Sequence, residues 1–210
     1  AWYFARNLMS SHPDEMNRAT LTLQSGVEMV EILHELNMDA ETLLTAMLFP
    51  VVVNKLMDWE NLKETFGAKI TKLLKGVLEM DNIRQLNASH SANALQVDNV
   101  RRMLLAMVDD FRCVIIKLAE RITFLRDAEH RCAEEDKVLA AKECSNIYAP
   151  LANRLGIGQL KWELEDYCFR YLHPEQYRAI AKLLQERRLD REHYIADFVE
   201  ELNGYLSENI

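Results

Sequence analysis

The chain is 210 residues long, and its composition (49% hydrophobic, 28% charged) is ordinary for a globular protein with a sizeable core. Its formal net charge of −8 disfavours general binding to nucleic acid or to an anionic membrane surface, and its apolar runs are too short to span a bilayer. Only 6 glycines and 4 prolines interrupt a sequence rich in helix-forming residues, so we expect an all-α fold.

The first predicted helices lie between residues 27 and 66. Apolar residues recur at helical spacing over residues 27–36, and Asp39 can cap a helix that begins near residue 41. That helix is predicted to run into an apolar turn that ends at residue 54. A short helix over residues 59–66 is then expected to end at Gly67, because glycine commonly terminates helices.

The middle of the chain carries three more apolar stripes. They cover residues 70–78, 97–108 and 111–122, and each has the 3.6-residue period of a helix with one buried face. Small polar residues fill positions 87–96, which predicts a loop between the first and second stripes.

The last third of the sequence predicts a charged connection followed by more helices. Residues 127–135 form the connection, and a helix over residues 138–151 is expected to bend at Pro150. A further helix should end near residue 173. The remaining sequence predicts two separate helices, of which the second covers about residues 190–206.

Four cysteines are widely spaced and form no CxxC pair, which disfavours a zinc site. We expect them to be reduced thiols in or near the core of a cytoplasmic protein. They are Cys113, Cys132, Cys144 and Cys168.

Several motifs follow one another in a characteristic order and spacing. They are VDNVRRM at residues 97–103, AMVDDFR at 106–112, IKLAER at 116–121, IYAPLANRLGI at 147–157 and KWELED at 161–166. From about residue 26 to residue 200 the chain therefore resembles the N-terminal half of the RelA/SpoT family of guanosine tetraphosphate enzymes. The resemblance implies a multi-helix bundle of the HD-domain type over residues 1–155, and a helical extension over residues 156–210 that leads toward a synthetase domain absent from this sequence.

The same resemblance implies that a metal site has been lost. Family members with a working hydrolase domain hold manganese with a His, a His-Asp pair and a later Asp. The matching positions here are Ser25, Phe49, Pro50 and Glu120. Phe and Pro have no side-chain donor atom, Ser is a poor neutral ligand, and one carboxylate does not make a site for a hard divalent ion. We therefore expect no metal and no other cofactor.

The catalytic residues are expected to be missing as well. The family's Glu-Asp pair, which handles the attacking water and its protons, corresponds to Val53 and Asn54, and neither is a general base. A residual guanosine-nucleotide pocket is implied at Tyr148 and Arg154, which lie in the motif that shapes the nucleotide pocket in the family. Any nucleotide bound there would act as a regulator.

These expectations favour a catalytically inactive, hydrolase-like regulatory domain. Its partner would be the synthetase domain of its own parent chain, a GTP diphosphokinase of the stringent response, with no direct binding to nucleic acid or membrane. Two alternatives stay open. One is an active metal-dependent phosphohydrolase with atypical ligands around Glu120 and Asp109-Asp110, and the other is a helical self-association module.

Overall fold

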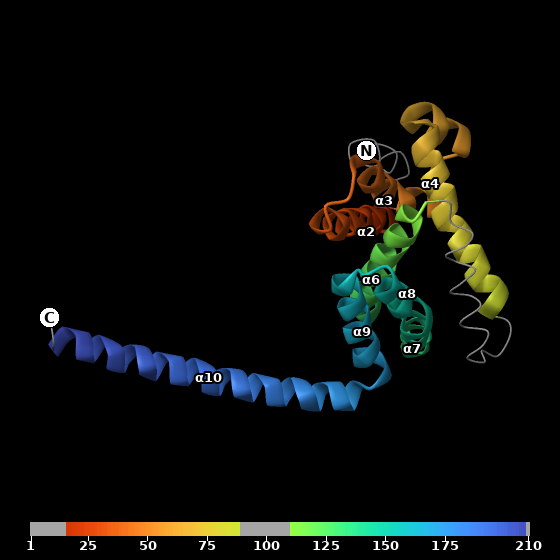
Figure 1. The fold of residues 1–210 in the computed structure, drawn as a ribbon. Coiled ribbons are helices and arrows are strands. Elements are labelled where there is room, and N and C mark those ends of the chain that lie inside the picture. Colours follow the sequence, from red (N-terminus) through yellow and green to blue (C-terminus); the bar gives the residue numbers. More distant parts are fainter. Residues whose placement is uncertain (1–15, 89–109, 209–210) are drawn as a thin grey trace. The chain divides into compact units, whose positions relative to one another are not determined.

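The computed structural model describes residues 16–88 and 110–208, and every element within those residues is a helix (Figure 1). The predicted all-α fold is confirmed. The elements are α2 (Met16–Glu35), α3 (Ala40–Val53), α4 (Trp59–Ala88), α6 (Arg112–Arg131), α7 (Glu134–Glu143), the π-helical turn η2 (Cys144–Tyr148), α8 (Ala149–Arg154), α9 (Gly158–Leu172) and α10 (Pro174–Glu208). Most of the predicted loop at 87–96 and the apolar stripe at 97–108 fall outside the described residues. Within them, no helix is both long enough and apolar enough to cross a membrane.

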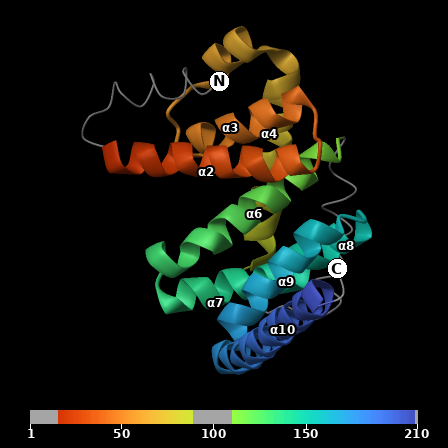
Figure 2. The ribbon, with the colours of Figure 1, turned by 90° about the vertical axis from the view of Figure 1, so that its left-hand side faces the viewer.

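Helix α6 runs through the middle of the first part of the fold. All of its residues from 113 to 119 are buried, as are Ile122 and Leu125. Helices α2 and α3 lie on one side of it, and α7 and η2 lie on the other, while α4 packs across it as well (Figures 1 and 2). The apolar surface of α6 therefore organises most of the core.

Helix α3 differs from the prediction. The sequence predicted a helix that runs into an apolar turn, whereas the helix continues through Pro50 to Val53. A proline inside a helix removes one backbone hydrogen bond. The surroundings compensate for that loss, because every residue from Thr45 to Val52 is buried. At the end of the helix, Asn54 donates both its backbone N–H and its side-chain amide to the Pro50 carbonyl.

Ion pairs connect the N-terminal end of α3 to the N-terminal end of α6. Asp39 caps α3 as predicted, accepting a hydrogen bond from the Thr42 N–H at 2.8 Å. The Arg112 guanidinium binds Asp39 at 2.8 Å, Asp110 at 2.6 Å and Glu41 at 3.2 Å. Its hydrogen bonds hold the pKa of Asp110 below the ordinary value, although partial burial opposes that shift. Asp110 therefore precedes α6 as part of an ion cluster.

Three other boundaries were predicted only in part. The helix after Trp59 is interrupted at Gly67 as expected, and the left-handed backbone there (φ 86°) suits glycine. Helix α6 extends to Arg131, so the charged connection is shorter than predicted. Ahead of Pro150 the chain forms η2, in which the Ala149 N–H bonds the Cys144 carbonyl five residues back. The change to a π turn rearranges the hydrogen bonds next to a residue that has no N–H to donate.

The chain divides into two compact units, one ending at Cys168 and the other beginning at Phe169. Helix α10 belongs to the second unit and is one helix where the sequence predicted two. No Gly or Pro occurs between residues 175 and 203, so nothing interrupts its backbone hydrogen bonds. The functional division at residues 155 and 156 stays a prediction.

The crossing of α4 and α6 depends on the small size of one residue. A methyl group added at Gly76 would lie 2.7 Å from the Cys113 sulfur. We predict that Gly76→Ala lowers the free energy of unfolding by about 1–3 kcal/mol through overpacking, although alanine is the better helix former. Combining it with Cys113→Ala should recover part of that loss, measured as the coupling in a double-mutant cycle by urea denaturation.

A matched control is available at Gly158, where an added methyl group would meet nothing within 4 Å. Gly158→Ala should leave stability nearly unchanged. Equal effects at the two glycines, or no coupling between Gly76 and Cys113, would contradict this explanation of the helix crossing.

Candidate hydrolase-like site

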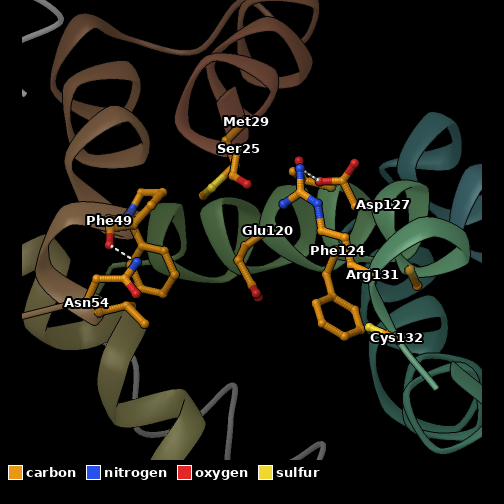
Figure 3. A pocket seen from close by; sticks show the side chains of 13 residues that line it. Ser25, Met29, Phe49, Asn54, Glu120, Phe124, Asp127, Arg131 and Cys132 are labelled. Atoms are coloured by element: carbon orange, nitrogen blue, oxygen red, sulfur yellow. Dashed lines mark hydrogen bonds and ion pairs between the residues drawn. The ribbon is translucent and has the colours of Figure 1, made fainter. Parts of the chain in front are cut away.

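A cavity of about 240 Å³ lies between α2, α3 and α6 (Figure 3). Its lining includes all six positions at which the family resemblance predicts that a metal ligand or catalytic residue is replaced or left alone. These positions are spread over 96 residues of sequence. They are Ser25, Phe49, Pro50, Val53, Asn54 and Glu120. The other lining residues are Met29, Thr123, Phe124, Asp127, Ala128, Arg131 and Cys132.

The α3 side of the cavity is mainly apolar. Phe49 and Pro50 are buried, and Val53 is open to solvent at the end of the helix. Among the described residues that line this side, the only polar side chain is that of Asn54, whose amide is used for capping and lies 2.8 Å from the Pro50 carbonyl. This wall offers hydrophobic contact and no charged donor or acceptor.

Glu120 extends toward the cavity from α6, between the α3 wall and Phe124 (Figure 3). Its carboxylate is already paired with two cations from the same helix. The Lys117 ammonium lies 2.8 Å from one oxygen, and the Arg121 Nε donates to the same oxygen at 2.7 Å. The Lys117 and Arg121 side chains are almost completely buried, at 1% and 9% exposure.

The two cations determine the charge state of Glu120. Burial acts to raise the pKa of the carboxyl group, but the positive charges and hydrogen bonds of Arg121 and Lys117 outweigh it and hold the pKa well below the usual range. The same Lys117 ammonium lies 5.5 Å from the centroid of the Phe49 ring, within range of a cation–π interaction. A cation from α6 therefore links the carboxylate to the aromatic ring of α3.

The opposite wall carries polar groups at helical spacing from Glu120. Thr123, Asp127 and Arg131 follow it along α6, and Arg131 binds Asp127 at 3.0 Å. The Thr123 hydroxyl is buried and has no hydrogen-bond partner among the residues that the structure describes. Sequence analysis did not select these residues, although their offsets of 3, 7 and 11 from Glu120 place them on one helix face.

This set of side chains does not fit a divalent metal ion. The four cavity positions that the family resemblance assigns to metal ligands supply one hydroxyl, one carboxylate and two side chains without donor atoms. The carboxylate is engaged by Lys117 and Arg121, which repel a cation. Among residues 16–88 and 110–208, no three His, Cys, Asp or Glu side chains are grouped so that they could hold a metal ion.

Other candidate residues lie away from the cavity walls. Tyr148 is buried in η2, and Arg154 is exposed at the end of α8, so their nucleotide-binding role stays a prediction. Asp110 belongs to the ion cluster around Arg112 and is not among the residues that line the cavity beside Glu120. Asp109 falls outside the described residues.

A profile of a protein family, described as "HD domain", matches residues 1–158, and the all-helical fold is consistent with that match. The chain belongs to the HD-domain family. Within it, the most informative relatives are GTP pyrophosphokinases, and the predicted resemblance to the RelA/SpoT family is confirmed.

Three relatives show the range of similarity. The chain is 91% identical over its whole length to the GTP pyrophosphokinase of Haemophilus influenzae, and 60% identical over 97% of its length to that of Escherichia coli. It is 37% identical over 87% of its length to the enzyme of Myxococcus xanthus. The matched regions cover 28%, 27% and 24% of those proteins, so the chain spans only about a quarter of the curated relatives it matches.

The ion cluster at the cavity makes a prediction for stability and its pH dependence. Glu120→Gln would leave the Lys117 and Arg121 cations facing a neutral amide. We expect the free energy of unfolding at pH 7 to fall by roughly 3 kcal/mol, as when one partner of a buried ion pair is removed. Because the folded-state pKa of Glu120 is lowered, its contribution is present above the unfolded pKa of about 4.3 and is lost at lower pH.

Urea denaturation of both proteins from pH 7 to pH 3 measures this effect. The difference in stability should narrow as the pH falls below about 4.3. Glu64→Gln, at an exposed position of α4, provides the matched control and should follow the parent curve. A constant difference across the whole pH range would contradict the charged role of Glu120.

Proposed function

We propose that this chain is a catalytically silent, hydrolase-like domain that regulates a GTP diphosphokinase. In the parent protein, a synthetase domain would transfer a diphosphate from ATP to the 3′ hydroxyl of GTP or GDP, in the cytoplasm. The present domain would restrain that synthetase. The names of the relatives support the parent activity, since the chain is 91% and 60% identical to parts of two GTP pyrophosphokinases.

The cavity carries the argument for catalytic silence. Hydrolysis of a pyrophosphate bond by a metal-dependent domain requires a metal-activated water and a group that takes its proton. Phe49 and Pro50 stand where metal ligands are expected from the family resemblance, and the positions of the acidic pair hold Val53 and Asn54. Glu120 remains, but its charge is balanced by Lys117 and Arg121.

The regulatory part of the proposal rests on α10. Its exposed apolar side chains recur at helical spacing; they are Ile180, Leu183, Leu184, Tyr194, Ile195, Phe198 and Val199. Exposed basic residues lie between the two groups, at Arg187, Arg188 and Arg191. A surface that combines apolar and basic groups suits contact with another domain of the same protein. Such contacts regulate only if they differ between the active and inactive states of the synthetase.

The first prediction concerns hydrolase activity of the isolated chain. The purified chain, incubated with guanosine tetraphosphate and manganese, should release no pyrophosphate above the buffer rate. Its melting temperature should not change when EDTA or manganese is added, because no ion contributes to the folded state. A manganese-dependent release of pyrophosphate, or a shift of several degrees with EDTA, would overturn the proposal and favour the active phosphohydrolase.

The regulatory prediction requires the parent protein. Reversing charge at Lys182, Arg187 and Arg188 should weaken the contact that restrains the synthetase, and basal synthesis should rise about five-fold or more, as for a coupling of 1 kcal/mol or greater. Synthesis is measured as conversion of labelled ATP and GDP without further activators. Lys63→Glu, at an exposed position of α4, is the matched charge control and should not change the rate of synthesis. Unchanged synthesis in the α10 variants would exclude this route.

A further inference from the structure

The charged side chains at the cavity between α2, α3 and α6 are paired. The charged lining residues are Glu120, Asp127 and Arg131. Both oxygens of Glu120 are engaged by Lys117 and Arg121, and Arg131 binds Asp127 at 3.0 Å (Figure 3). Lys117 and Arg121 are almost completely buried and are not among the lining residues. An ionic ligand would have to break these pairs or bring its own charge into a mainly apolar space, and both are unfavourable.

Two aromatic rings line the cavity from different helices. Phe49 lies on α3 and Phe124 on α6, and Glu120 extends between them (Figure 3). Each ring has a cation near it: the Lys117 ammonium lies 5.5 Å from the Phe49 centroid, and the Arg121 guanidinium lies 5.0 Å from the Phe124 centroid. The same two cations bind Glu120, so one set of contacts positions both rings and the carboxylate. The apolar walls are therefore preformed, as is usual for small-molecule sites.

Thr123 adds an unpaired polar group to these walls. It is 3% exposed, it lines the cavity one helical turn after Glu120, and its hydroxyl has no hydrogen-bond partner within the described part of the chain. Most buried hydroxyls are hydrogen-bonded, because an unpaired one is unfavourable. A hydroxyl can both donate and accept a hydrogen bond. The Thr123 hydroxyl is therefore suited to pair with a hydroxyl or a ring N–H of a molecule in the cavity.

We propose that the cavity binds a small neutral aromatic molecule that carries a single hydroxyl group or ring N–H. Phe49 and Phe124 would contact its ring, and the Thr123 hydroxyl would bind its polar group. The open space of about 240 Å³ is large enough, since an engineered apolar cavity of about 150 Å³ binds benzene. This ligand class differs from the guanosine nucleotides that the family resemblance places at Tyr148 and Arg154. The inference does not depend on the regulatory role proposed above.

The cavity is open to solvent at its edge and contains a residue that can report on binding. Val53 is 47% exposed, and Cys132 is partly exposed on the cavity wall. The other three cysteines, Cys113, Cys144 and Cys168, are buried. Cys132 is therefore the thiol that a soluble alkylating reagent should modify first, and a ligand in the cavity should shield it.

The test measures how fast iodoacetamide modifies Cys132 in the folded 210-residue chain at increasing concentrations of 4-ethylphenol. Modification is followed by mass spectrometry of the tryptic peptide 132–137. We expect the rate to fall about three-fold or more, with half of the effect below about 1 mM, which is ordinary for a ligand of this size. The melting temperature of the chain should rise over the same range of concentrations.

Two matched compounds test the ligand class. Ethylbenzene lacks the hydroxyl and should bind about five-fold more weakly than 4-ethylphenol, as expected for the loss of one hydrogen bond. The anion 4-ethylbenzoate keeps the ring and should bind about ten-fold more weakly, or less well still, because its charge would lie in a mainly apolar space beside side chains that are already paired.

Two threonine variants test the role of the hydroxyl. Thr123→Val removes an unpaired hydroxyl and keeps the shape of the side chain, so stability should not fall, and 4-ethylphenol should lose its advantage over ethylbenzene. Thr71→Val is the matched control. Thr71 is buried on α4 outside the cavity lining, and its hydroxyl donates to the Gly67 carbonyl at 2.9 Å. This variant should lower stability and leave the preference between the two ligands unchanged.

Three outcomes would overturn the proposal. The first is a rate of Cys132 modification that stays the same at every soluble concentration of 4-ethylphenol. The second is binding of 4-ethylbenzoate that equals or exceeds that of 4-ethylphenol, because the ligand would then not need to be neutral. The third is a preference for 4-ethylphenol over ethylbenzene that persists in Thr123→Val.

Discussion

The centre of the first unit depends on the ion pairs that Glu120 makes with Lys117 and Arg121. A carboxylate and two long cationic side chains lie within a helix that is otherwise surrounded by apolar residues. Each charge alone would be costly to bury, and each is made tolerable by the others. Lys117 also contacts the Phe49 ring of α3, so the cluster connects two helices across the cavity. The same ion pairs engage both oxygens of the Glu120 carboxylate.

The altered positions have different structural roles, although they share one cavity. Phe49 and Pro50 contribute to the core, and Asn54 ends α3 by bonding the Pro50 carbonyl. Glu120 is held by ion pairs, while the nearby Thr123 hydroxyl has no hydrogen-bond partner in the described part of the chain. The α3 side is therefore part of the hydrophobic core, whereas the α6 side carries polar groups around an open space of about 240 Å³.

Local sequence signals predicted much of this fold. Helical periodicity located most of the described helices, and the cap at Asp39 and the interruption at Gly67 were predicted from side-chain chemistry. The predicted ends of two helices differ from the structure, for different reasons. Tertiary burial carries α3 through Pro50, and the absence of a breaker keeps α10 continuous. For the site, the resemblance to a family singled out six of the 13 residues that line the cavity and missed the polar row that follows Glu120 along α6. It did not indicate that Lys117 and Arg121 neutralise Glu120, because pairing of this kind depends on rotamers and helix packing.

Helix α3 has a consequence for the order in which the protein folds. Five β-branched residues and a proline in its 14 residues give it little tendency to form a helix by itself. Its helical state depends on burial against α2, α4 and α6, and α6 begins about sixty residues later in the chain. During synthesis on the ribosome, α3 should therefore remain unformed until α6 has emerged, and its contacts should be weak in the folding transition state. The wall of the cavity would then be among the last parts of the first unit to become ordered.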